Sequence, residues 1–177
     1  IGVIEKAPAP SYDLGLVYNF NSLSTLPDSI SATDANNDSI SLSTENSADG
    51  KALKLDVKAI GITHNSGVTF SVKRGSLNGT GLSFWMMSQY PNTWGTVAFR
   101  STDINGKTKW FKINGDYGNP ASILSGSPGG FGYTVNYSQL YQVSDWLSAV
   151  PNGSEKKPTS ADISGFDMVC IGCYMWD

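Results

Sequence analysis

Apolar and polar side chains alternate with a period of two along most of this chain, as they do in β-strands that have one buried and one solvated face. In residues 51–60, Leu53, Leu55 and Val57 alternate with lysine and aspartate, and residues 67–74 repeat the pattern. Glycine, asparagine, proline and serine separate such segments, which is typical of turns. The pattern predicts about nine strands, at residues 15–22, 38–44, 51–60, 67–74, 81–88, 94–103, 107–113, 130–137 and 163–176.

The connections between these strands indicate antiparallel pairing. Asn105 and Gly106 predict a tight hairpin turn, because both residue types tolerate the positive φ angles that such a turn requires. Residues 137–150 predict a short helical turn or an irregular loop, and no long segment has a helical period. The predicted fold is therefore all-β, a β-sandwich (jelly roll) of two antiparallel sheets, in preference to a barrel.

A proline-containing segment precedes the strands. The sequence Ala-Pro-Ala-Pro favours extended chain, so residues 1–12 are predicted to be a linker or an N-terminal arm. Residues 13–177 are then one domain, which is a size that can bury its own core. A domain that follows a linker is usually one module of a longer polypeptide, so a monomer within a multi-modular protein is expected.

Composition and charge narrow the class of protein. The net charge is -3 and only two arginines are present, so the basic surface that nucleic acids require is missing. No run of 18 apolar residues exists, so no transmembrane helix is expected. Twelve of the 15 acidic residues are aspartate, and glycine, serine, asparagine and threonine are abundant, which fits a turn-rich β protein. The same composition suits a secreted, extracellular bacterial domain.

Two cysteines, Cys170 and Cys173, form a C-x-x-C sequence near the end of the chain. Redox motifs of this type lie at helix N-termini, and a zinc site would need ligands beyond these cysteines and the single His64. Residues three apart on a strand face opposite sides, so the two thiols are predicted to be separate parts of a packed strand.

The sequence contains no motif of nucleophilic catalysis, since no serine lies in a G-x-S-x-G elbow. A pair of carboxylates could in principle serve a glycosidase, and five aspartates are considered for it. These are Asp56, Asp103, Asp116, Asp145 and Asp167. No feature singles out one pair, so a non-catalytic role is favoured over an enzyme.

The aromatic residues are more informative. If Phe99 and Phe111 fill the core, alternation places Arg100, Trp110 and Lys112 on the opposite face of the same sheet. An exposed tryptophan beside an arginine suits a sugar ring, whose C–H face stacks on the indole while polar groups bind the hydroxyls. Burial of Trp110 beneath a loop is the alternative. Further aromatic candidates for this platform are Tyr133, Tyr174 and Trp176.

The order of several segments resembles carbohydrate-binding modules with a galactose-binding-like jelly roll, and is closest to the β-glucan-binding family eleven and its relatives on cellulosomal enzymes. The segments are LVYNFNSL, STENSADGKALKLDV, LSFWMMS, VNYSQLYQVSDW and ISGFDMVCIG. The resemblance implies that the Asp145-Trp146 pair and Gln142 contact the glycan. It also implies one more strand after residues 163–176, so the domain either lacks a final strand or places another strand at that edge.

The resemblance also implies a structural Ca²⁺ site. Its ligands would come from Asn21, Ser47 and Asp49, and residues 45–50 carry the hard oxygen donors that Ca²⁺ prefers. A solvated turn explains residues 45–50 equally well. Asn21 stands where the family has an acid, so any site should be weak or lost.

These observations predict a non-catalytic carbohydrate-binding module. It would target a plant cell-wall polysaccharide, a β-glucan or a hemicellulose, for a secreted bacterial glycoside hydrolase. The alternatives are a small jelly-roll polysaccharide hydrolase or lyase, and a surface adhesion module that binds protein.

Overall fold

The computed structural model describes residues 20–22, 24–34, 39–47, 50–58, 63–86, 93–113, 131–148, 150 and 156–176. These residues form ten strands, two 3-10 turns and one short helix. The elements are η1 (Phe20–Ser22), β1 (Ile30–Asp34), β2 (Ser39–Ser47), β3 (Gly50–Lys58), β4 (Thr63–Ser71), β5 (Gly81–Met86), β6 (Thr93–Thr102), β7 (Thr108–Ile113), β8 (Phe131–Asn136), η2 (Tyr137–Gln139), β9 (Leu140–Val143), α1 (Ser160–Ser164) and β10 (Phe166–Trp176).

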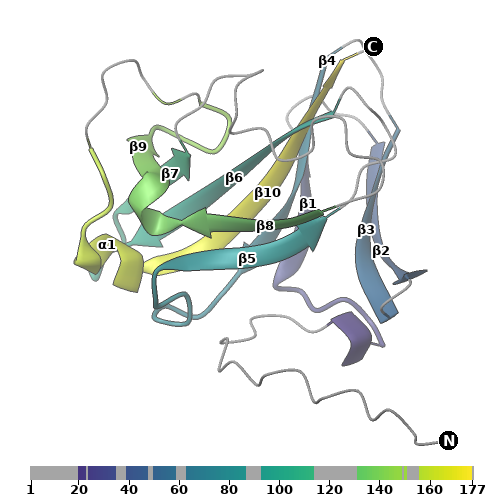
Figure 1. The fold of residues 1–177 in the computed structure, drawn as a ribbon, viewed down its shortest axis with the longest axis horizontal. Helices are drawn as coiled ribbons and strands as arrows, with labels where there is room; N and C mark the ends of the chain where they lie inside the picture. Colours follow the sequence, from purple (N-terminus) through teal and green to yellow (C-terminus); the bar gives the residue numbers. More distant parts are fainter. Residues whose placement is uncertain are drawn as a thin grey trace, which may run out of the picture.

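Six of the strands form one antiparallel sheet in the order β1-β4-β10-β6-β7-β9 (Figure 1). The last strand, β10, lies in the interior of this sheet and pairs with β4 on one side and β6 on the other. The remaining four strands form two two-stranded antiparallel sheets, β2-β3 and β5-β8. The all-β prediction is therefore confirmed.

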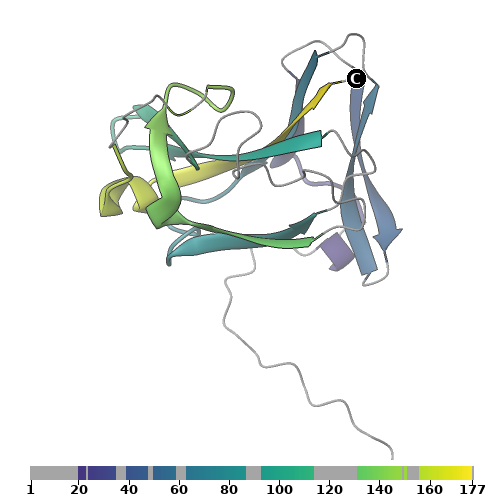
Figure 2. The same ribbon diagram turned by 45° about the horizontal axis from the view of Figure 1, so that its top comes forward.

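The hydrophobic core lies between the six-stranded sheet and the β5-β8 pair, which runs beneath β6 and β10 in Figure 2. Antiparallel register aligns Phe99 with Phe111 and with Val169, so the three side chains line one face. Val135 of β8 meets this face from the other layer, and Phe166 packs edge-on against Phe111. This face is called the inner face below.

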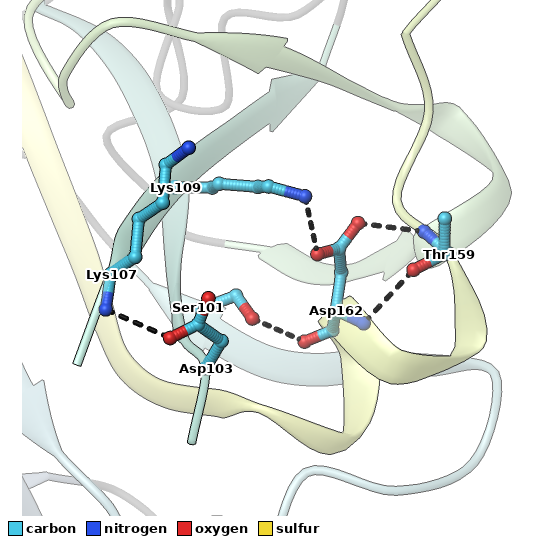
Figure 3. A network of polar contacts seen from close by, with 6 residues as sticks. All are labelled: Ser101, Asp103, Lys107, Lys109, Thr159 and Asp162. Carbon is cyan, nitrogen blue, oxygen red and sulfur yellow. Dashed lines mark hydrogen bonds and ion pairs between the residues drawn. The ribbon is translucent and has the colours of Figure 1, made fainter. Parts of the chain in front are cut away.

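A polar network closes one end of the sandwich (Figure 3). Thr159 caps the helix α1 by accepting the Asp162 backbone N–H, and the Asp162 carboxylate accepts the Thr159 N–H in return. Lys109 of β7 donates to the same carboxylate at 3.1 Å, and the Ser101 hydroxyl of β6 donates to the Asp162 carbonyl at 2.6 Å. The helix is thereby tied to the β6-β7 hairpin.

The predicted hairpin turn is also present. Asp103 Oδ1 accepts the backbone N–H groups of Asn105 and Lys107, and Gly106 has a φ of 82°. A residue with a Cβ would be strained at that φ, which is why glycine follows asparagine here.

Some sequence predictions differ from the structure. Strand β1 was not predicted, because it is short and half polar, and residues 20–22 of the predicted first strand form a 3-10 turn. Residues 137–150 contain a 3-10 turn as predicted, but also the strand β9. The predicted linker, residues 1–12, lies outside the described residues. In the described part of the chain, no helix has the length and apolar character needed to cross a membrane.

Candidate sugar-binding face

The face of the six-stranded sheet that points away from the core is called the outer face. On β10 it comprises positions 168, 170, 172, 174 and 176, and the alternate positions Val169 and Ile171 belong to the inner face. The register therefore places positions 170 and 173 on opposite faces, as predicted for the two cysteines. Cys170 is fully buried on the outer face, and position 173 pairs with Gly95 on the inner one.

Trp110 and Arg100 are direct neighbours on the outer face, as alternation predicted. Their positions pair across β6 and β7, and both side chains are partly exposed. The Arg100 guanidinium donates two hydrogen bonds to Asp167, at 3.0 and 3.1 Å, and Thr102 donates to the same carboxylate at 2.8 Å. A bulge in β10 between Phe166 and Met168 places Asp167 for this contact. The guanidinium beside Trp110 is thus held in one orientation.

A compact turn, residues 144–148, follows β9 and folds over the outer face. Asp145 Oδ1 organises it by accepting the N–H groups of Leu147 and Ser148 and the Ser148 hydroxyl, at 2.8 to 2.9 Å. The hydroxyls of Ser144 and Ser148 are also bonded, at 2.6 Å. One oxygen of the predicted sugar ligand Asp145 is therefore occupied in shaping this turn.

Lys112 holds the turn from below. Its side chain is 7% exposed, and the ammonium donates to the main-chain carbonyls of Trp146 and Ser148, at 2.8 and 2.9 Å. Burial lowers the pKa of Lys112 from 10.5 to about 8, against the opposing effects of Cys170 and Asp145. The prediction that Lys112 projects into solvent is wrong, because alternation assigned its face but could not show that the turn covers it.

Trp146 lies on the sheet at Gly172. A Cβ built on Gly172 would stand 2.8 Å from Trp146 Cζ3 and 3.3 Å from Cε3, and 3.2 Å from Thr96 Cγ2. Glycine inside a strand weakens it and often marks a close approach of another group. Here that group is the indole ring, which remains partly exposed. The structure thus brings Trp110 and Trp146 to the same face.

The backbone register extends this face along β10. Positions 174 and 176 belong to it, as predicted, although the side chains of Tyr174 and Trp176 lie outside the described part. Position 94 pairs with position 174 and was missed, although it has the same parity as Arg100 in the sequence. Along β6, Arg100 and position 94 are six residues apart, which corresponds to about 20 Å at the usual rise per residue of a strand. The outer face is therefore longer than one sugar ring.

Another aromatic residue of the outer face was missed by sequence reasoning. Tyr141 of β9 pairs with Lys112, and the Lys157 ammonium stands 4.9 Å from the centre of its ring. This cation–π contact covers the ring at the sheet edge. Nothing in the alternation of residues 137–150 indicated it, because the strand β9 was not recognised.

Two predicted ligands do not share this face. Gln142 pairs with Phe111, so its position belongs to the inner face at the edge strand. Position 133 pairs with Phe84 in the separate β5-β8 sheet, and the Tyr133 side chain lies outside the described part. Neither is brought beside Trp110 by the sheet.

The predicted calcium ligands are only partly described. Asn21 lies against the β2-β3 turn, where its Oδ1 accepts the backbone N–H of Lys51. An oxygen that faces a donor is poorly placed for a cation. No group of three His, Cys, Asp or Glu residues suited to a metal occurs among the described residues, and Asp49 and the Ser47 side chain are not described. The expectation that any calcium site is weak or lost stays a prediction.

The aspartates considered for catalysis have local partners where they are described. Asp56 pairs with Lys54, Asp103 shapes the hairpin, Asp145 shapes the turn at 144–148, and Asp167 binds Arg100. Asp116 lies outside the described part. Each of the four described carboxylates thus has a partner in the local structure.

Comparison with known proteins gives a structural likeness. No family model matches the chain, and no curated protein matches it. Among solved structures, the family 11 carbohydrate-binding module of a cellulosomal cellulase of Clostridium thermocellum matches with a TM-score of 0.54 and 15% identity, over 89% of each chain. At this identity the likeness speaks for the fold alone. The predicted jelly-roll sandwich is thereby confirmed, and the chain has the fold of such a module.

Proposed function

We propose that this chain is a non-catalytic carbohydrate-binding module whose outer face binds a polysaccharide. The observation that carries the proposal is the placement of two partly exposed tryptophans, Trp110 and Trp146, on one sheet face. Exposed tryptophans on a solvated sheet are unusual, and their flat apolar rings suit the C–H faces of sugars. The fold shared with a carbohydrate-binding module supports the same conclusion.

The finer proposal is that the ligand is a plant cell-wall polysaccharide, a β-glucan or a hemicellulose. An unbranched chain could lie along the strands, because the outer face extends for several residue pairs of β6 and β10. A secreted bacterial glycoside hydrolase would carry the module and be held near its substrate by it. The fold likeness to a module from a cellulosomal cellulase motivates this context.

Affinity electrophoresis tests the proposal directly. Gels containing soluble cellulose, xyloglucan, mixed-linkage glucan, xylan or mannan should retard the wild-type protein in at least one case. Trp110→Ala and Trp146→Ala should each weaken that binding by about 2 kcal/mol, roughly 30-fold, as is usual for a central aromatic anchor.

Ile104→Ala is the matched control, because Ile104 is an 88% exposed apolar residue at the tip of the β6-β7 hairpin. It should bind as the wild type does. Unchanged retardation of both tryptophan variants would show that the site is wrong. Release of reducing sugar by the purified protein, abolished by one aspartate substitution, would favour the hydrolase alternative instead.

A further inference from the structure

The turn 144–148 is held at two points. From inside the turn, Asp145 binds two backbone N–H groups and a hydroxyl. From the sheet beneath, Lys112 binds the carbonyls of residues 146 and 148. One bound carbonyl belongs to Trp146 itself and the other to Ser148, two residues further on, so the tether acts on the backbone that carries the ring.

The sheet beneath the ring is shaped to receive it. Gly172 has no side chain, and the Trp146 ring occupies the space where a Cβ would otherwise project. Gly67 of β4 pairs with Gly172, so the same row of the sheet is bare on the neighbouring strand as well. Thr96 of β6 lies on the other side of Gly172. The ring therefore rests in a shallow seat between two strands rather than projecting freely.

We propose that Lys112 and Gly172 are positioning residues that fix the Trp146 ring in its binding orientation before the glycan arrives. This inference rests on the proposed function, since it assigns a role within that same site. A ring that is already ordered loses little entropy on binding, whereas a mobile ring must be ordered at the expense of affinity. If the competent orientation falls to a fraction of its population, the apparent Kd rises by the inverse of that fraction.

Lys112→Met and Gly172→Ala test the two contacts separately. Methionine is about as long as lysine but has no ammonium group, so Lys112→Met removes the tether to the turn. The substitution also removes the buried charge, so the variant is expected to fold. Alanine at 172 lifts the ring off its seat. Each variant should raise the apparent Kd for the retained glycan at least about fivefold, while Lys107→Met, at an exposed hairpin lysine, should leave it within twofold.

A readout that needs no glycan separates this inference from the proposed function. The protein has five tryptophans, and in a sample labelled with ¹⁵N-tryptophan the indole resonance missing from Trp146→Phe identifies Trp146. In Lys112→Met and Gly172→Ala this resonance should shift or broaden, and the other indole resonances should stay in place. In the wild type it should titrate near pH 8, and in Lys112→Met it should not.

The groups that face Lys112 define what else could titrate there. They are Asp145 in the turn, Cys170 across the sheet on β10 and Tyr141 on β9, while β6 contributes the non-titrating Ala98. Cys170→Ser should therefore retain a Trp146 titration if Lys112 is its source.

The outcomes are distinguishable. Altered Trp146 resonances in both variants support the positioning role even if the wild type binds no glycan, in which case only the proposed function fails. Glycan binding by the wild type together with unchanged Trp146 resonances and unchanged affinity in both variants overturns the positioning role and leaves the proposed function standing.

Discussion

Lys112 should make the stability of this protein depend on pH in a direction opposite to that of an ion-paired lysine, whose pKa is raised by folding. Its pKa is about 8 in the folded protein and 10.5 as the ordinary value. Between these two values the unfolded chain binds a proton that the folded protein does not, so the free energy of unfolding rises with pH. Below pH 8 both states are protonated, and the folded protein then carries the full cost of a buried ammonium.

The size of the effect follows from the displacement of this pKa. Each pKa unit is worth about 1.4 kcal/mol, so a displacement from 10.5 to about 8 amounts to about 3 kcal/mol. More than two thirds of this gain should appear between pH 7 and pH 10. Lys112 is 7% exposed, so screening by solvent reduces the effect little.

Urea unfolding at pH 7, 8, 9 and 10 measures it, with tryptophan fluorescence and circular dichroism as two probes of the transition. The difference in unfolding free energy between wild type and Lys112→Met should rise by about 2 kcal/mol over this range. Subtracting the variant cancels the other titrating groups. Lys107→Met, at an exposed position, should run parallel to the wild type. If the unfolding free energies of Lys112→Met and of the wild type changed in parallel with pH, the burial argument would be refuted, because a solvated lysine has the same pKa in the folded and unfolded states.

Three further predictions concern other parts of the molecule. Burial alone would raise the pKa of Asp162, but hydrogen bonds from Thr159 and Lys109 lower it overall. Asp162→Asn should therefore lower the free energy of unfolding by about 1 kcal/mol near pH 7. In thermal unfolding, the variant should also lose less stability than the wild type as the pH falls through 4. Tyr137 donates to the Leu77 carbonyl at 2.9 Å, and burial raises the pKa of Tyr137 to about 12. Tyr137→Phe should therefore lower the free energy of unfolding by about 1–2 kcal/mol at pH 7. The difference from the wild type should shrink above pH 10, because there ionisation of the tyrosine in the unfolded chain destabilises only the wild type. Exchange of EDTA for millimolar calcium should leave Tm within about 1 °C, because Asn21 Oδ1 accepts an N–H; a rise of several degrees would contradict this.

Alternation in the sequence was sufficient to assign the faces of β6, β7 and β10, because a period of two is a local property of the backbone. It paired Arg100 with Trp110 on one face and Phe99 with Phe111 on the other. It could not reveal that Lys112 is covered, because the covering turn lies about thirty residues further along the chain. Long-range contacts of this kind leave no periodic signal.

Short helices and strands were the other part of the structure that the sequence did not predict. The helix α1 has five residues, too few to express a helical period, and it was not predicted; the spacing of Thr159 and Asp162 as a capping box was the signal that could have revealed it. The strand β9 has four residues and follows a 3-10 turn, so Tyr141 and Gln142 could not be assigned to faces from sequence. Recognising β9 would have placed Tyr141, and not Gln142, beside Lys112.

The short strand β9 is one of the two edges of the six-stranded sheet, and exposed edges recruit strands of other molecules. Gln142 donates its backbone N–H to the Lys156 carbonyl at 2.7 Å, and Lys157 donates to the Ser138 carbonyl at 2.7 Å. The returning chain therefore occupies hydrogen-bonding groups at this edge and adds two positive charges beside it. Two copies of the domain that approached each other at this edge would meet a capped, positively charged border, which opposes edge-to-edge aggregation.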